Sequence, residues 1–224
     1  MNPLAGAALI AVLCLMAPTA HAGIIHGMLR VPSAMSVSTR PMNAYPGQAG
    51  SMAGMPATLR GVVTDAIVYV DHVPALAESA LKESSAAKPR LAQKDQAFVP
   101  RVLAVAVGTQ VGFPNQDPIY HNVFSLSPVR RFNLGKYPRG SSRDVLFNKP
   151  GLVNVYCDIH SDMEAFVLVL PHHGFVQPLL SGEYQLPDLP AGRYVLRVWH
   201  PDLGDLSTTV DVPTKGDVTA NLSY

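Results

Sequence analysis

The chain has 224 residues, of which 48% are hydrophobic and 15% are charged, and its 17 basic side chains nearly balance its 16 acidic ones. This length is sufficient for one or two domains that each bury a core. The near-neutral composition argues against a protein that binds nucleic acid or a membrane surface through strong net charge. Twenty prolines and seventeen glycines among short runs of Val, Leu and Thr predict an all-β fold of strands joined by turns.

Residues 1–22 have the pattern of an export signal. An apolar stretch is followed by Pro18 and by Ala20-His21-Ala22, which places small residues at the two positions that a signal peptidase reads. We expect cleavage after this triplet, export to the periplasm and no remaining membrane span; an uncleaved membrane anchor is the alternative. Cleavage removes Cys14 and leaves Cys157 as the one cysteine, so no internal disulfide can form.

Residues 23–60 begin with a short apolar run, Gly23 to Leu29, and continue as a stretch rich in Ser, Ala, Pro and Gly. We predict an extended, weakly ordered arm. Its methionines offer thioethers, which Cu(I) favours, but their irregular spacing is also typical of a plain linker. They are Met28, Met35, Met42, Met52 and Met55.

The sequence of residues 61–89 predicts one or two strands followed by a helix. Val62 to Asp71 has the apolar pattern of one or two strands with a turn near Thr64-Asp65. Leu76 to Lys88 is rich in Ala, Glu, Lys and Ser, so we predict a short exposed helix that ends before Pro89.

Residues 90–171 contain closely spaced strand candidates that are separated by Gly, Pro and Asn turns. This regular spacing predicts a β-sandwich. The candidates are Val102–Val107, Gln110–Phe113, Asn122–Leu126, Val145–Phe147, Leu152–Tyr156 and Ala165–Leu170.

A cluster of metal-binding residue types lies between the last two of these strands. Cys157, His160 and Met163 fall within seven positions, and a loop can turn all three side chains toward one point. His121, which begins an earlier strand, supplies a second imidazole. Two His, one Cys and a weak axial Met form the donor set that suits copper in outer-sphere electron transfer. Because protein ligands fill the site, we expect one copper ion, no open position for a substrate and no enzymatic activity.

These residues resemble the cupredoxins, or type 1 blue copper proteins, and the Cys-x-x-His-x-x-Met spacing is most similar to that of amicyanin. Phe98-Val-Pro100, Asn115-Gln-Asp117 and His121-Asn122-Val123 resemble the first half of such a domain, and Val155-Tyr-Cys157 resembles the second. The resemblance covers residues 90–171 and implies a Greek-key sandwich. It also implies that Asn122 braces the ligand loop near the cysteine sulfur.

Two further features concern the partner. Amicyanin loops usually carry Pro or bulky apolar residues between the ligands, whereas Asp158, Ser161, Asp162 and Glu164 surround His160 here. In cupredoxins the loop histidine is commonly the electron port, so acidic neighbours would suit a basic redox partner. A basic run between the halves of the site is either a solvated loop or a docking patch for an acidic partner. It comprises Arg130, Arg131, Lys136, Arg139 and Arg143.

Several alternatives stay open at this point. A Cys-x-x-His pair can bind zinc, and Cys157 with His160 could act as nucleophile and base. The chain could also be a copper-delivery module, or a structural protein that keeps only the scaffold. His172-His173 are either exposed or an accessory metal site.

The segment 172–224 predicts a second, smaller β unit. Its strand candidates include Gly192 to Trp199, and it resembles the last strands of carboxypeptidase-regulatory-like sandwiches, which are usually non-catalytic. Such a sandwich would lack its opening strands here. We therefore hypothesise that Ile24–Leu29 and Val62–Asp71 pair with this unit, and that the copper domain is inserted between them. The whole chain also resembles cupredoxin-like proteins of Gram-negative bacteria that are called methylamine utilisation proteins.

Overall fold

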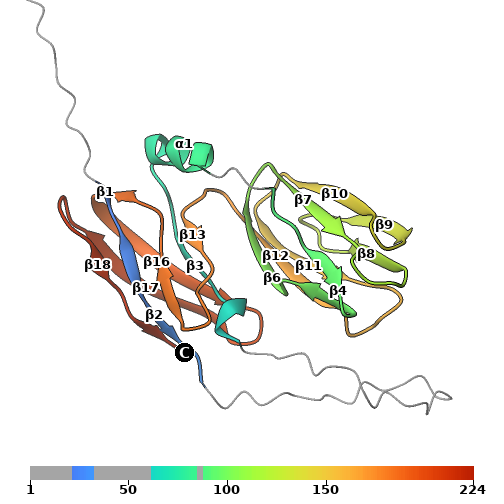
Figure 1. Cartoon of the computed structure of the whole chain (residues 1–224). Coiled ribbons are helices and arrows are strands. Elements are labelled where there is room, and N and C mark those ends of the chain that lie inside the picture. Colours follow the sequence, from blue (N-terminus) through green and yellow to red (C-terminus); the bar gives the residue numbers. More distant parts are fainter. Residues whose placement is uncertain (1–21, 33–61, 85–87) are drawn as a thin grey trace, which may run out of the picture.

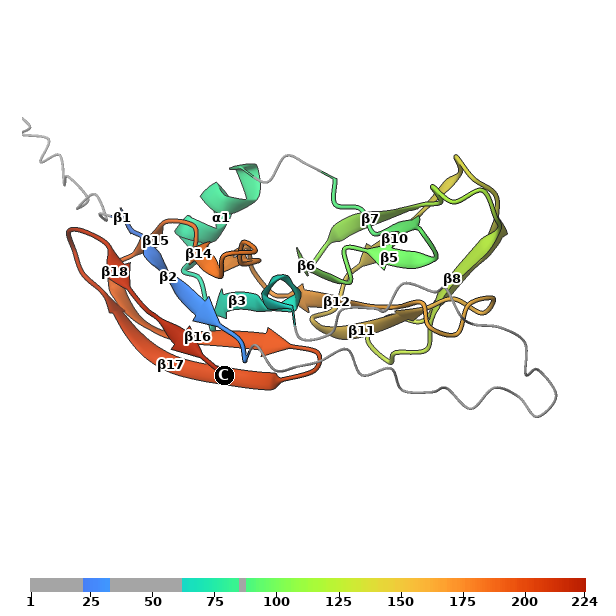
Figure 2. The same ribbon diagram turned by 60° about the horizontal axis from the view of Figure 1, so that its bottom comes forward.

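The computed structural model describes residues 22–32, 62–84 and 88–224, which form two β-sandwiches lying side by side (Figure 1). We call residues 88–171 the inserted unit, and residues 22–32, 62–84 and 172–224 the flanking unit. The turned view also separates the two units (Figure 2). The prediction of an all-β sandwich fold is confirmed, with one short α-helix. No helix among the described residues is long and apolar enough to cross a membrane.

The inserted unit contains a five-stranded sheet in the order β6-β12-β11-β8-β9, a β7-β10 pair and a β4-β5 hairpin. In the five-stranded sheet β6 and β12 run parallel, and the other neighbours are antiparallel. The strands are β4 (Ala92–Lys94), β5 (Ala97–Val99), β6 (Val102–Ala106), β7 (Thr109–Pro114), β8 (His121–Ser125), β9 (Phe132–Tyr137), β10 (Ser142–Phe147), β11 (Gly151–Tyr156) and β12 (Glu164–Leu170).

The flanking unit places the sheet β13-β3-β16-β17 against the sheet β14-β2-β18, with β19 also paired to β2. Strands from both sides of the inserted unit therefore share these sheets: β3 pairs with β16, and β2 with β14. Its elements are β1 (Ala22–Gly23), β2 (Ile25–Arg30), the 3-10 turn η1 (Val63–Asp65), β3 (Ile67–Val70), α1 (Ala75–Ser84), β13 (Phe175–Val176), β14 (Glu183–Gln185), β15 (Leu189–Pro190), β16 (Gly192–His200), β17 (Gly204–Val212), β18 (Val218–Thr219) and β19 (Leu222–Ser223).

Each unit has its own hydrophobic core, and a third buried cluster joins them. Strand β12 shows why: Ala165, Val167 and Val169 belong to the core of the inserted unit, whereas Leu168 and Leu170 point to the other face. That outer face packs against Ile67 of β3 in the flanking unit. A strand that is buried on both faces has an uninterrupted apolar sequence, as Ala165–Leu170 of β12 has.

Three local expectations are corrected. Residues 22–23 and 25–30 are strands β1 and β2, so the extended arm does not begin at residue 23, whereas the pairing of β2 with β14 and β18 agrees with the pairing hypothesised for Ile24–Leu29. The helix spans Ala75 to Ser84 and so begins one residue before the predicted start, and residues 85–87 of the predicted helix lie outside the described residues. The basic run is not a solvated loop throughout, since Lys136 lies in β9 and Arg143 in β10. The predicted signal peptide up to His21 and the arm from residue 33 to 60 lie outside the described residues.

Candidate metal centre

The ligand loop, residues 157–163, connects β11 to β12 and is closed by its own backbone. The Cys157 N–H donates to the Met163 carbonyl at 3.3 Å, and the Met163 N–H donates to the His160 carbonyl at 3.1 Å. The β11–β12 ladder begins immediately outside the loop, where Tyr156 pairs with Glu164. These contacts hold both ends of the loop together, so Cys157 and Met163 lie buried at the two ends of one closed turn, while Asp158, Ser161 and Asp162 are exposed.

His121 reaches the same region from β8. The β8–β9 ladder has a register irregularity between Asn122 and Phe124, and His121, Asn122 and Val123 are consecutively buried. A bulge of this kind interrupts the alternation of faces and re-aims a side chain. The fully buried His121 thereby faces the loop instead of the solvent.

The structure brings three of the four predicted ligands into one group. His121 Nδ1 lies 3.8 Å from Cys157 Sγ, and the ring centroids of His121 and His160 are 4.8 Å apart. The potential ligand atoms of His121, Cys157 and His160 all lie within 4.8 Å of one another. The Met163 side chain is 1% exposed and belongs to the same buried cluster as Cys157.

Two nitrogen atoms show that the group fits a metal ion. His160 Nδ1 is buried and has no hydrogen-bond partner, which is costly unless another group binds it. On His121, Nε2 lies 2.7 Å from Asp117 Oδ2, and a ring that donates this hydrogen bond from Nε2 can offer Nδ1, beside the sulfur, to a metal ion. Two imidazoles, a thiolate and a thioether fit copper better than zinc, because Met is a poor zinc ligand.

Asp117 was part of a recognised motif, but sequence reasoning gave it no role. Its carboxylate accepts hydrogen bonds from the backbone N–H of Asp95 at 2.6 Å and of Gln96 at 2.9 Å. Both donors have positive φ, 55° and 56°, in the tight β4–β5 turn. Burial raises the pKa of Asp117, but the Gln96 N–H, the His121 ring and the Asp95 N–H outweigh it, so the pKa is lowered. Asp117 therefore stays a carboxylate that holds the His121 ring in place.

Asn122 is 3% exposed and follows His121 directly. Its Oδ1 atom is buried without a hydrogen-bond partner. The bracing contact that the resemblance implies stays a prediction.

His160 is the ligand nearest to solvent. It is half-buried, and burial followed by the nearby His121 lowers its pKa. The side chains of Asp158, Ser161 and Asp162 are exposed beside it. Ile159 is 41% exposed, so the loop offers the solvent an apolar side chain as well as acidic ones.

The remaining histidine candidates have structural partners. His172, which we expected to be exposed, is 6% exposed, and its Nδ1 accepts from the Gly174 N–H at 3.2 Å. His173 contacts Glu78 of α1 through Nδ1 at 2.5 Å. Neither ring is arranged as a second metal site. Met28 lies in β2, and the other four arm methionines lie outside the described residues.

No protein-family model and no curated protein sequence matches the chain. Solved structures match part of it. A copper-containing nitrite reductase from Thermus scotoductus SA-01 is 25% identical at a TM-score of 0.36, and the match covers 38% of this chain but only 22% of that enzyme. A purple cupredoxin from Nitrosopumilus maritimus is 22% identical, with a TM-score of 0.34 and coverage of 37% and 99%. A Cu(I) amicyanin variant is 18% identical, with a TM-score of 0.36 and coverage of 46% and 98%.

Proposed function

We propose that the chain is a periplasmic, cupredoxin-like protein that holds one type 1 copper ion and carries single electrons between partner proteins. The observation that carries this proposal is the convergence of His121, Cys157 and His160, with ligand atoms within 4.8 Å of one another. When bound there, copper would supply a one-electron couple between Cu(I) and Cu(II), which this donor set suits.

The role of the protein is to fix the donors before any electron moves. His121, Cys157 and Met163 are each at most 5% exposed, so water is excluded from most of the site. Asp117 fixes one imidazole, and the loop hydrogen bonds fix the segment that carries the other ligands. Rigid donors change little between oxidation states. With every donor supplied by protein, the site favours a carrier over an enzyme.

The half-buried His160 is the proposed port for electrons, because the other donors lie deeper. Exposed Asp158 and Asp162 flank it. Opposite charges steer protein encounters, so a redox partner with a basic docking face suits this end of the molecule. The export pattern of residues 1–22 supports a periplasmic location.

The test is optical. Cu(II) added to the purified mature protein should give an intense visible band from thiolate-to-copper charge transfer, and Cys157→Ser should abolish it. Ser161→Ala, an exposed substitution in the same loop, is the matched control and should leave the band intact. A wild-type protein that stays colourless would sink the proposal. Reversible oxidation and reduction with fast electron self-exchange would distinguish a carrier from a copper-delivery module.

A further inference from the structure

Arg101 joins the two units at their interface. It lies between β5 and β6 of the inserted unit, and its side chain is 8% exposed. Its Nη1 donates to Asp65 Oδ2 at 2.9 Å and to Asp202 Oδ2 at 2.8 Å, and its Nη2 donates to Asp202 Oδ1 at 3.2 Å. Asp65 and Asp202 both belong to the flanking unit. One buried guanidinium of the inserted unit is therefore held by two carboxylates of the flanking unit.

The same guanidinium also reaches the start of β12. Nη2 lies 3.2 Å from Glu164 Oε1, and the guanidinium carbon lies 5.2 Å from the centre of the Phe166 ring. The Arg101 carbonyl accepts from the Phe166 N–H at 2.9 Å. Glu164 directly follows Met163. The cluster formed by Arg101, Asp65, Asp202 and Glu164, which we call the Arg101 clamp, thus ends one residue from a proposed copper ligand.

The clamp is not a second metal site. Asp65, His200 and Asp202 bring potential ligand atoms within 4.8 Å of one another. However, His200 Nε2 donates to the Val62 carbonyl at 3.2 Å, and its Nδ1 accepts from the Asp202 N–H at 3.1 Å. Both ring nitrogens are used, and Arg101 already supplies the cation for the two carboxylates.

The charges in the clamp depend on one another. Burial lowers the pKa of Arg101, but the hydrogen bonds that it donates to Asp202 and Asp65 outweigh burial and raise the pKa, so the guanidinium stays charged. Burial raises the pKa of Asp65. When one partner of a buried ion pair is removed, the other is left as an uncompensated charge, so the remaining groups must rearrange. A change at Asp202 is therefore transmitted to Arg101 and from there to Glu164.

We infer that Arg101 is a positioning residue through which the flanking unit fixes Met163 relative to Cys157. Glu164 is the first residue of β12, and the Met163 carbonyl just before it accepts from the Cys157 N–H at 3.3 Å. A shift of Glu164 therefore displaces the backbone that carries both sulfur ligands. This inference rests on the proposed function, because fixing Met163 relative to Cys157 affects electron transfer only if both sulfur atoms bind copper.

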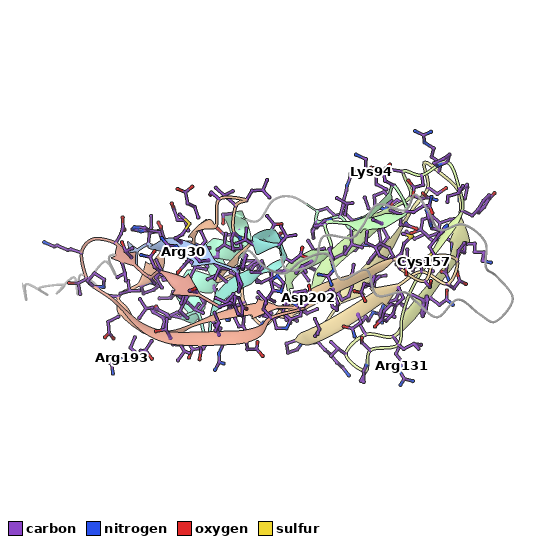
Figure 3. All side chains as sticks on the ribbon, turned by 90° about the horizontal axis from the view of Figure 1, so that it is seen from below. Arg30, Lys94, Arg131, Cys157, Arg193 and Asp202 are labelled. Atoms are coloured by element: carbon purple, nitrogen blue, oxygen red, sulfur yellow. The ribbon has the colours of Figure 1, made fainter. Side chains whose placement is uncertain are left out.

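The experiment compares two Asp→Asn substitutions in the flanking unit. Asp202→Asn weakens the clamp, whereas Asp211→Asn removes the same charge from an exposed pair with Arg193. Figure 3 shows Asp202 where the units meet and Arg193 at the far end of the flanking unit from Cys157. Asp202→Asn should shift the reduction potential and the relative intensities of the thiolate-to-copper bands, while Asp211→Asn should leave both as in the wild type.

A second readout uses the copper-free protein. Asp202→Asn should accelerate hydrogen exchange at the amides of Cys157 and Met163, which close the loop. Arg101→Lys keeps the positive charge but loses the planar guanidinium that binds several carboxylates at once, so it should also accelerate exchange at these amides. This variant provides the same test if Asp202→Asn folds poorly. In a double-mutant cycle that measures this exchange, Asp202→Asn should add little to the effect of Glu164→Gln, because both substitutions remove contacts of the same guanidinium.

The outcomes separate this inference from the proposed function. A coloured wild-type protein whose spectrum, potential and amide exchange do not respond to Asp202→Asn would overturn the inference alone. Strictly additive effects of Asp202→Asn and Glu164→Gln would also overturn it. They would show that each charge acts on the site separately and that the effect of Asp202 does not pass through Arg101 to Glu164. A colourless wild type would overturn the proposed function, whereas faster exchange in Asp202→Asn but not in Asp211→Asn would still support the clamp.

Discussion

The two sandwiches use their interiors differently. The inserted unit buries polar side chains beside its apolar core, among them Gln93, Asn115, Asp117, His121 and Asn122. The core cluster of the flanking unit consists of aliphatic side chains and two tyrosines. Buried polar groups cost free energy unless each finds a partner, and several near the loop, such as His160 Nδ1, have none within the protein. The inserted unit thus tolerates a cost that a metal ion would offset, whereas the buried polar side chains of the flanking unit, Asp65, His172 and His200, each have a hydrogen-bond partner within the protein.

The largest effect is expected from a substitution that leaves a cavity in the core of the flanking unit. Leu196 lies in β16 and is 0% exposed. Leu196→Ala should lower the free energy of unfolding by about 2–5 kcal/mol, through lost transfer free energy and the cavity left behind. Denaturant titration would measure this, with exposed Thr209→Ala as the control. The visible spectrum of the copper-loaded protein should not change, and a changed spectrum would contradict the division between the two interiors.

A smaller effect is expected at the carboxylate that orients a ligand. Asp117→Asn can keep an oxygen for His121 Nε2 and the Gln96 N–H, which share Oδ2, but it then turns an amide N–H₂ toward the Asp95 N–H donor. Losing such a partner typically weakens metal affinity by about tenfold to a hundredfold. Competition titration with a copper chelator would measure the loss. Asp158→Asn removes an exposed charge from the ligand loop and is the control; equal losses in both variants would contradict the orienting role.

The smallest effect concerns a polar contact in the core of the inserted unit. The Tyr137 hydroxyl donates to the Phe113 carbonyl at 2.8 Å and accepts from Gln93 Nε2 at 2.6 Å. Tyr137→Phe should cost about 1 kcal/mol of unfolding free energy, at the lower end for an unsatisfied buried group. The loss is limited because Gln93 Nε2 also lies 3.5 Å from the Phe113 carbonyl.

The same residue gives a pH dependence. Burial raises the pKa of Tyr137 to about 12. Because the unfolded phenol ionises first, near the ordinary tyrosine pKa of 10.0, the stability from this group is complete below that pH and is lost as the pH rises toward the folded pKa. The unfolding free energy of the wild type should therefore fall more steeply than that of Tyr137→Phe over this range. Parallel pH profiles would contradict the assignment.

The ligand loop could be predicted from sequence because its chemistry is local. Cys157, His160 and Met163 lie within seven positions, and the loop needs only two flanking strands to gather them. His121 was predicted by its motif, although nothing local shows that β8 carries a bulge. Asp117 was missed because its role depends on a turn about twenty positions upstream, where two backbone N–H groups point at it.

The interface between the units was beyond sequence reasoning. Arg101 finds Asp65, Glu164 and Asp202 at separations of 36, 63 and 101 positions, and no pattern marks these four as partners. Strand β9 was missed because Gly135, which has a φ of 67°, interrupts the alternation that Phe132, Asn133 and Leu134 begin. The apolar run of β12 was predicted as a strand, but which surface would cover its second face depended on the packing of the whole chain.

The two-sided burial of β12 also governs how the chain behaves while it is being made. The inserted unit is complete at residue 171, but β16, which supplies Trp199 against Phe166 at a ring distance of 5.9 Å, is synthesised later. Until then only β3, which precedes the inserted unit, can contact the outer side chains Phe166, Leu168 and Leu170, and the rest of this apolar face lacks its cover, the kind of surface that promotes aggregation. A nascent or truncated chain that ends before β16 would therefore be prone to aggregate. The C-terminal strands complete the cover of the domain that precedes them in the sequence.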